Sequence, residues 1–189
     1  RKSSGRSQSS ETSPRLFDHP FARPELLTRA LTHRSLAYES HPETPLDPAS
    51  DNEQLEFVGD AVLGLAVAES LFRRFPSSRE GELTRLRASL VSRHHLSHVA
   101  ARIGLGDLLL LGRGEEQSGG RQKTALLANA IEAVIAALYL DGGLDAARSF
   151  IEKYIIEPAL PDLRLAMQAG DTFSGAIGDH KSALQERSE

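Results

Sequence analysis

The most constraining feature of this chain is the segment over residues 124–140, which is apolar on almost every side. Only Asn129 and Glu132, three positions apart, bring strongly polar groups into its middle. A helix that is apolar all round cannot lie on a surface, so we expect this one at the centre of a core. Gly142 and Gly143 follow it and are expected to end it.

The remaining periodic segments also predict helices, so the expected fold class is all-α. Leu and Ala dominate these segments, and aromatic residues make up only 5% of the chain. Pro24 suits the first position of a helix, and Ser50 with Glu53, like Ser77 with Glu80, has the spacing of a capping box. The expected helices cover residues from Pro24, about 53–74, about 80–103, 124–140 and 144–156, with a Gly-rich loop over 112–123.

Length and composition indicate one intracellular domain with tails. The 189 residues contain no Cys, so disulfides and thiolate zinc sites are excluded, and a cytoplasmic location is expected. No apolar run approaches membrane-spanning length, and no membrane partner is expected. The net charge of −4 does not exclude a nucleic-acid partner, because a basic face can coexist with an acidic site. The expected division is a disordered tail over 1–15, a folded domain over 16–158, a C-terminal helix and linker over 159–178, and a separate segment over 179–189.

Three acids are concentrated in NEQLEFVGDAVL, residues 52–63. Glu53, Glu56 and Asp60 stand at i, i+3 and i+7 and so share one helix face between apolar positions. A line of carboxylates in an apolar helix repels itself and is costly to desolvate, which favours a positive partner. The alternative is a solvated acidic face on an ordinary amphipathic helix.

A second set of oxygen ligands lies on the central segment. A buried Glu132 without a partner would be expensive, so it either faces the acids of the first helix or pairs with an arginine. With Asn129 it would complete a set of hard oxygen ligands, and no Cys or His pair is nearby. Such ligands select Mg²⁺ or Mn²⁺ and commonly serve phosphate chemistry.

At this point the chain resembles a known family, that of ribonuclease III. The signature-like stretch is NEQLEFVGDAVL, and four further blocks match in order and at the usual spacing. The resemblance covers about residues 16–156 and is highly specific. The four other blocks are ALTHRSLAYE, EGELTRLRASLV, LGRGEEQSGGR and ANAIEAVIAALYLDGG.

The resemblance implies a homodimeric all-α endonuclease that cuts double-stranded RNA, as in the processing of ribosomal and messenger RNA precursors. It implies Mg²⁺ as cofactor, with Mn²⁺ as a substitute, and products with 5′-phosphate and 3′-hydroxyl ends and short 3′ overhangs. Carried over by position, Asp60 and Glu132 match catalytic acids, and Glu56 and Glu132 match metal ligands together with position 129. Glu53 and Glu80 match supporting acids, and Phe57 matches a dimer contact, although Phe57 taken alone would be assigned to the core.

Two features depart from the complete family pattern. Asn129 stands where bacterial members usually carry Asp, so the site keeps a carbonyl oxygen but loses one negative charge. The alternative function is therefore a catalytically weakened or inactive RNA-binding member of the same fold.

The C-terminal segment is the second departure. HKSALQE, residues 180–186, resembles the start of a double-stranded-RNA-binding domain, so 179–189 is interpreted as a truncated piece of one. The alternative is a frayed helix.

Basic residues supply the candidate RNA contacts. Double-stranded RNA is recognised mainly by shape, through phosphates and 2′-hydroxyls. Without an RNA-binding domain, affinity is expected to be weak and strongly salt-dependent. The candidates are Arg85, Arg87, Arg113, Arg121 and Lys123.

Overall fold

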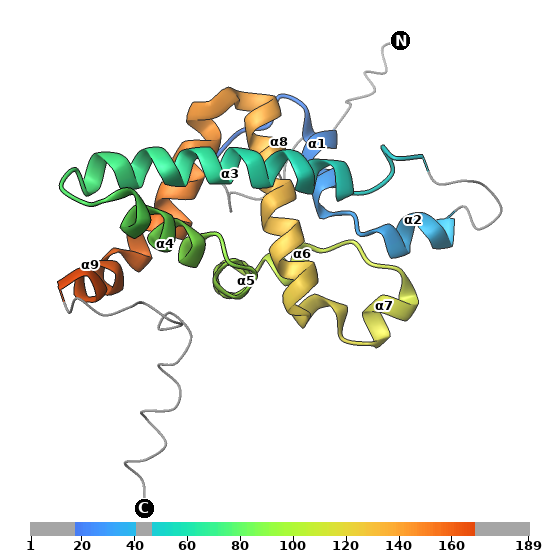
Figure 1. Cartoon of the computed structure of the whole chain (residues 1–189). Helices are drawn as coiled ribbons and strands as arrows, with labels where there is room; N and C mark the ends of the chain where they lie inside the picture. Colours follow the sequence, from blue (N-terminus) through green and yellow to red (C-terminus); the bar gives the residue numbers. More distant parts are fainter. Residues whose placement is uncertain (1–17, 41–46, 169–189) are drawn as a thin grey trace, which may run out of the picture.

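The computed structural model describes residues 18–40 and 47–168, and within these ranges the chain is all-α, as expected from the sequence (Figure 1). The predicted tail over 1–15 and the segment 179–189 lie outside the described residues. Short 3-10 turns cover Gly120–Gln122 and Glu157–Ala159, and a π-helical turn covers Glu152–Ile156. The α-helices are α1 (Pro24–Leu31), α2 (Arg34–Ser40), α3 (Glu53–Arg74), α4 (Glu80–Leu90), α5 (Arg93–Arg102), α6 (Leu105–Leu108), α7 (Arg113–Gln117), α8 (Thr124–Ile151) and α9 (Leu160–Gln168).

Helix α8 is the centre of the core, as its uniform apolarity predicts. Every residue from Ala133 to Leu138 is fully buried, because α3, α5 and α1 pack around this helix. Gly143 has a φ of 77° and a ψ of −176°, which breaks the helix where the sequence predicts its end. The chain resumes helical geometry directly afterwards, and α3 packs across the first half of α8 (Figure 1).

The expectation that no apolar run approaches membrane-spanning length is wrong for this segment. The stretch 124–165 contains an 18-residue window with a mean hydropathy of 1.5, long and apolar enough by composition to cross a membrane. Within the protein, 56% of that window is buried. Its apolarity is therefore that of a core helix, which passes the same test as a membrane span.

Gly59 allows the central crossing of α3 over α8. A Cβ built at this position would stand 1.8 Å from the backbone oxygen of Glu132, far inside any real contact. The two backbones can therefore approach only because residue 59 has no side chain. This contact fixes which faces of the two helices meet, and it sets the position of the polar residues on either side of it.

The predicted capping boxes are wrong at both helix starts. Helix α3 begins at Glu53 itself, and the Asp51 carboxylate accepts the Glu53 N–H at 3.0 Å. Helix α4 begins at Glu80, and Glu82 Oε2 accepts the Arg79 N–H at 2.7 Å. Each glutamate with the capping-box spacing is thus the first residue of its helix rather than the third, so it cannot reach back to the cap.

Two segments differ from the expected secondary structure. The single helix predicted over 80–103 is two helices, because Ser92 interrupts it and its Oγ accepts the His95 N–H at 3.2 Å as the N-cap of α5. The loop predicted over 112–123 contains α7 and a 3-10 turn. Arg121 stabilises this region, since its guanidinium donates to the carbonyls of Gly106, Asp107 and Leu109.

Candidate active site

The acids of α3 and the polar pair of α8 line one pocket beside the helix crossing. The pocket has a volume of about 500 Å³. The close approach at Gly59 places the two helices so that both contribute side chains to it. Its lining residues are Glu53, Glu56, Phe57 and Asp60 from α3, and Asn129 and Glu132 from α8.

Glu132 is the most perturbed group in this pocket. Burial, followed by the negative charges of Asp60 and Glu56, raises the pKa of its carboxyl to about 7, against the opposing effect of Arg93. Within the described part of the chain, its carboxylate takes part in no ion pair, so the alternative of a locked Glu–Arg pair does not hold there. A partly buried, unpaired acid next to two other acids is a site that favours a cation.

Glu56 shares this environment, and Arg93 moderates it. Burial raises the pKa of Glu56, and the charges of Glu53 and Asp60 act in the same direction, while the positive charge of Arg93 lowers it. Arg93 is the first residue of α5. The sequence shows Arg93 only as one of several arginines on a helix, so its proximity to the acids could not be inferred from spacing.

A salt bridge holds Glu53 at the rim of the pocket. Arg34 Nη1 donates to Glu53 Oε1 at 2.8 Å, and Arg34 Nη2 donates to the Tyr38 hydroxyl at 3.2 Å. The guanidinium also lies 5.3 Å from the centre of the Tyr38 ring. The sequence analysis missed Arg34 as a site residue, although it stands in ALTHRSLAYE, because nothing in that block indicates which acid it reaches.

Comparison with known proteins identifies the family. The model of Ribonuclease-III-like proteins matches residues 23–159. The chain belongs to the Ribonuclease-III-like family. It is 53% identical over 172 residues to Ribonuclease 3 of Solibacter usitatus, covering 90% of this chain and 62% of that protein. It is 52% identical to Ribonuclease 3 of Leifsonia xyli, covering 86% of this chain and again 62% of the relative.

Solved structures of the family have the same fold. The nuclease domain of ribonuclease III from Campylobacter jejuni superposes with a TM-score of 0.69 at 36% identity, covering 79% of this chain and 99% of that one. Dicer from Pichia stipitis superposes with a TM-score of 0.50 at 27% identity, covering 82% of this chain and 68% of that one. The chain thus covers 99% of the Campylobacter jejuni nuclease domain and about 62% of the length of its two relatives above.

Glu80 lies outside the pocket of this Ribonuclease-III-like chain. It begins α4, is exposed, and its Oε1 accepts the Thr84 hydroxyl at 2.7 Å. A single copy of the chain therefore does not bring the predicted supporting acid to the other carboxylates. Its supporting role stays a prediction from the resemblance.

Phe57 is on the surface, not in the core. Its side chain is 81% exposed, and it borders the acidic pocket. The core assignment that its apolarity alone suggests is therefore wrong. An exposed phenylalanine of this size is available for a contact with another molecule, and its dimer role stays a prediction from the resemblance.

The candidate RNA contacts divide into two groups. Arg121 donates to three backbone carbonyls and pairs with Glu116 at 2.6 Å, and Lys123 Nζ pairs with Glu115 at 2.6 Å. These two side chains stabilise the 106–123 region, so their selection as RNA contacts has no support from the geometry. The others, Arg85, Arg87 and Arg113, are exposed, and their side chains form no ion pair within the described ranges.

The donor set of the pocket fits a hard divalent cation. Carboxylate and amide oxygens are the ligands that Mg²⁺ and Mn²⁺ prefer, and the unpaired Glu132 leaves a negative charge to be neutralised. Within the described residues, no group of three His, Asp or Glu side chains is close enough together to hold a metal ion. The residues that could hold one are Glu56, Asn129 and Glu132.

The pKa of Glu132 predicts how the metal-free protein responds to pH. Its carboxyl titrates near 4.5 when unperturbed and near 7 in the fold, so the folded state holds the proton more tightly. The stability gained is complete below pH 4.5 and is lost as the pH rises through 7. After solvent screening, the expected loss in free energy of unfolding is about 1–2 kcal/mol between pH 5 and pH 8. Urea unfolding of the parent chain and of Glu132→Gln in EDTA would measure this contribution as the difference between their pH profiles, because Glu56, His33 and His95 also have shifted pKa values and shape both profiles. Identical profiles for the two proteins would contradict the assignment.

Proposed function

We propose that this chain is the nuclease part of an endoribonuclease that hydrolyses double-stranded RNA with Mg²⁺ as cofactor, with Mn²⁺ as a substitute. The products would carry 5′-phosphate and 3′-hydroxyl ends with short 3′ overhangs. The observation that carries the proposal is the convergence of Glu56, Asp60 and Glu132 from two helices, with Glu132 unpaired in the described structure. Its membership of the Ribonuclease-III-like family supports the same activity.

The side chains have distinct proposed roles. Glu56, Glu132 and the carbonyl oxygen of Asn129 would hold the cation, and Asp60 with Glu132 would act next to the scissile phosphate. The bound cation would neutralise charge on the phosphate and lower the pKa of a water. The raised pKa values of Glu56 and Glu132 mean that these acids must lose protons before they can act as ligands.

A cleavage assay tests the proposal directly. The purified chain would be incubated with a long RNA duplex and either Mg²⁺ or Mn²⁺, with EDTA as the control. Fragments bearing 5′-phosphates and short 3′ overhangs are expected in both metals. Retention of the duplex without cleavage in both metals would instead favour an RNA-binding member of the fold.

That second function has one specific observation in its favour, Asn129. It lines the pocket with a neutral amide where the family's bacterial members usually have a carboxylate. The loss of one charge should weaken metal binding, so Asn129→Asp is expected to lower the Mg²⁺ concentration needed for half-maximal cleavage about tenfold, equivalent to about 1.4 kcal/mol. Titrating Mg²⁺ against the cleavage rate in both proteins measures the shift. An identical metal dependence in the two proteins would show that the amide does not weaken metal binding.

A homodimer is the proposed assembly. Phe57, Leu65 and Phe72 are exposed by 81%, 56% and 70%, and their spacing of eight and seven residues places them on one side of α3. The Campylobacter jejuni nuclease domain has a region involved in dimer formation. A second copy of this chain would cover the apolar stripe and remove it from water.

Leu65→Glu tests the dimer without touching the acidic pocket. A charge in the middle of a buried stripe should be strongly unfavourable, so the variant is expected to be monomeric where the parent chain is dimeric. Light scattering after size exclusion measures the molar mass. Leu165→Glu on α9 is the matched control, because Leu165 is 64% exposed and lies outside the stripe. Equal masses for the two variants would rule out this interface.

RNA contact is proposed through Arg85, Arg87 and Arg113, the candidates whose guanidinium groups form no ion pair in the described ranges. Binding would follow duplex shape and phosphate charge and would weaken steeply with salt. Precursors of ribosomal and messenger RNA are the proposed substrates. A cytoplasmic location completes the proposal, in keeping with a chain of 189 residues that contains no Cys.

A further inference from the structure

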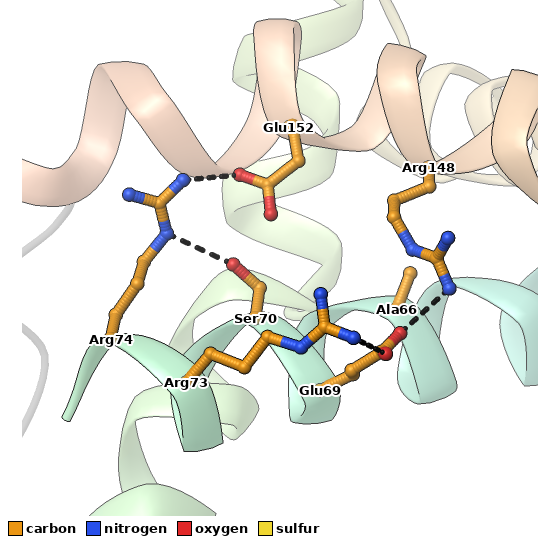
Figure 2. Close-up of a pocket in the computed structure, with 7 residues that line it drawn as sticks. All are labelled: Ala66, Glu69, Ser70, Arg73, Arg74, Arg148 and Glu152. Atoms are coloured by element: carbon orange, nitrogen blue, oxygen red, sulfur yellow. Dashed lines mark hydrogen bonds and ion pairs between the residues drawn. The ribbon is translucent and has the colours of Figure 1, made fainter. Parts of the chain in front are cut away.

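A second pocket lies between the C-terminal half of α3 and the part of the chain that follows the Gly143 break. Its volume is about 220 Å³. Figure 2 shows Arg73 and Arg74 projecting from α3 and Arg148 projecting from the facing helix, with two glutamates between them. The full lining consists of Ala66, Glu69, Ser70, Arg73, Arg74, Arg148 and Glu152.

The acceptors of Glu69 are already used by the arginines. Glu69 Oε1 accepts from Arg73 at 2.5 Å, and Glu69 Oε2 accepts from Arg148 at 2.8 Å, so both oxygens of this carboxylate are engaged (Figure 2). Arg148 Nη1 also donates to Oδ1 of the exposed Asp145 at 2.7 Å. A cation would have to displace a guanidinium to reach Glu69.

Donors, in contrast, are in excess. A guanidinium has five N–H donors. Within the described ranges, Arg73 donates one hydrogen bond, to Glu69, and Arg74 donates two, to Ser70 and to Glu152. The Nε–H of Arg148 is buried without an acceptor among the described residues. The three guanidinium groups pair with Glu69, Glu152 and Asp145, so the charges balance while N–H donors remain unused in the described structure. The pocket is therefore short of acceptors, and an oxyanion would supply them.

This pocket is separate from the acidic one. The two share helix α3 but no residue, and Arg73 lies thirteen positions after Asp60, about 20 Å along a helix. The charges of their linings also differ. Four acids line the first pocket, and in the described part of the chain only Glu53 among them is paired with an arginine. Three arginines and two glutamates line this one. At about 220 Å³ it is smaller than a typical drug-sized site, which suits a small ion.

We propose that Arg73, Arg74 and Arg148 form a binding site for a phosphate-class oxyanion, held by the guanidinium N–H donors that have no acceptor in the part of the chain that the structure describes. The site stands independently of the proposed nuclease activity, since none of its residues lines the acidic pocket. The phosphate could belong to a free phosphate compound or to the backbone of an RNA. Both have the same chemistry at the site, and the experiment separates them.

The first arm titrates inorganic pyrophosphate into the whole chain in EDTA, so that no metal bound at the acidic pocket contributes. Calorimetry should show saturable binding, and Arg74→Gln should weaken it about tenfold or more, because hydrogen bonds to a charged group are lost. Arg73→Gln, whose side chain is 68% exposed and forms one ion pair, should act in the same direction with less risk to folding. Arg164→Gln is the matched control, since Arg164 is an exposed arginine on α9 outside the pocket.

The second arm measures retention of a short RNA duplex on filters, again in EDTA. Loss of duplex affinity in Arg73→Gln but not in Arg164→Gln would assign the site to backbone phosphate. Unchanged duplex affinity together with weakened pyrophosphate binding would assign it to a free phosphate compound. The proposal is overturned if pyrophosphate shows no saturable binding to the parent chain, or if Arg164→Gln weakens binding as much as the two pocket variants do.

Discussion

Gly59→Ala should destabilise this protein by about 3 kcal/mol or more, a large effect for the addition of one methyl group. The added Cβ would stand 1.8 Å from the Glu132 backbone oxygen and 2.5 Å from its carbonyl carbon. Backbone atoms in the middle of a helix cannot move aside as the end of a flexible side chain can. Helices α3 and α8 would have to separate, and the core between them would lose contacts. Urea unfolding followed by circular dichroism measures the change.

Gly81→Ala is the matched control for that prediction. Gly81 lies in α4, and a Cβ there would meet nothing within 4 Å. Alanine has the higher helix propensity, so this substitution should be neutral or stabilise the protein by up to about 1 kcal/mol. Equal effects of the two substitutions would show that the helix crossing does not depend on the missing side chain. The crossing is also what forms the acidic pocket, so any folded Gly59→Ala protein should cleave RNA poorly.

Glu132→Gln should reduce cleavage of an RNA duplex by about 100- to 1000-fold, corresponding to several kcal/mol of lost transition-state stabilisation. The substitution keeps the size of the side chain and removes the charge that the proposed cation would neutralise. The single-turnover rate at saturating Mg²⁺ is the appropriate measurement. Binding of the duplex should persist, because the acid repels phosphate rather than attracting it.

The fold of the Glu132→Gln variant should remain intact. In metal-free buffer at pH 8 it should be at least as stable as the parent chain, since a partly buried carboxylate flanked by Asp60 and Glu56 is replaced by a neutral amide. Glu157→Gln, at an exposed acid in the turn before α9, is the control and should cleave normally. Full activity of Glu132→Gln would remove the basis of the proposed function, while equal losses in both variants would indicate an unspecific charge effect.

The sequence predicted the helical architecture well because helix formation and burial follow from local periodicity. The uniform apolarity of residues 124–140 predicted the central helix, and Pro24, Gly104 and Gly143 stand at breaks in the structure. Helix starts were less predictable, as Ser50 and Ser77 show. The same Ser-x-x-Glu spacing is compatible with a helix that begins at any of several residues, and only the packing of the preceding turn selects one of them.

The candidate site was also partly predictable. The spacing of Glu53, Glu56 and Asp60 placed them on one face, and the cost of burying Glu132 required a partner for it elsewhere in the fold. Their catalytic and ligand roles stay predictions. Tertiary contacts showed what local spacing could not: Arg121 and Lys123 are used to stabilise their own loop, and Glu80 is outside the pocket.

By itself, then, the sequence determined which segments are helical, which helix is central and which acids share a face, because each of these depends on residues only a few positions apart. Only the tertiary structure decided that Gly59 meets the backbone of Glu132, that Arg34 holds Glu53, and that arginines 73, 74 and 148 line a common pocket. The hydrogen bonds behind these arrangements join residues far apart in sequence: Arg34 and Glu53 are 19 positions apart, and Arg148 and Glu69 are 79 apart. They depend on how helices pack, and no local pattern records the distance between two side chains on different helices.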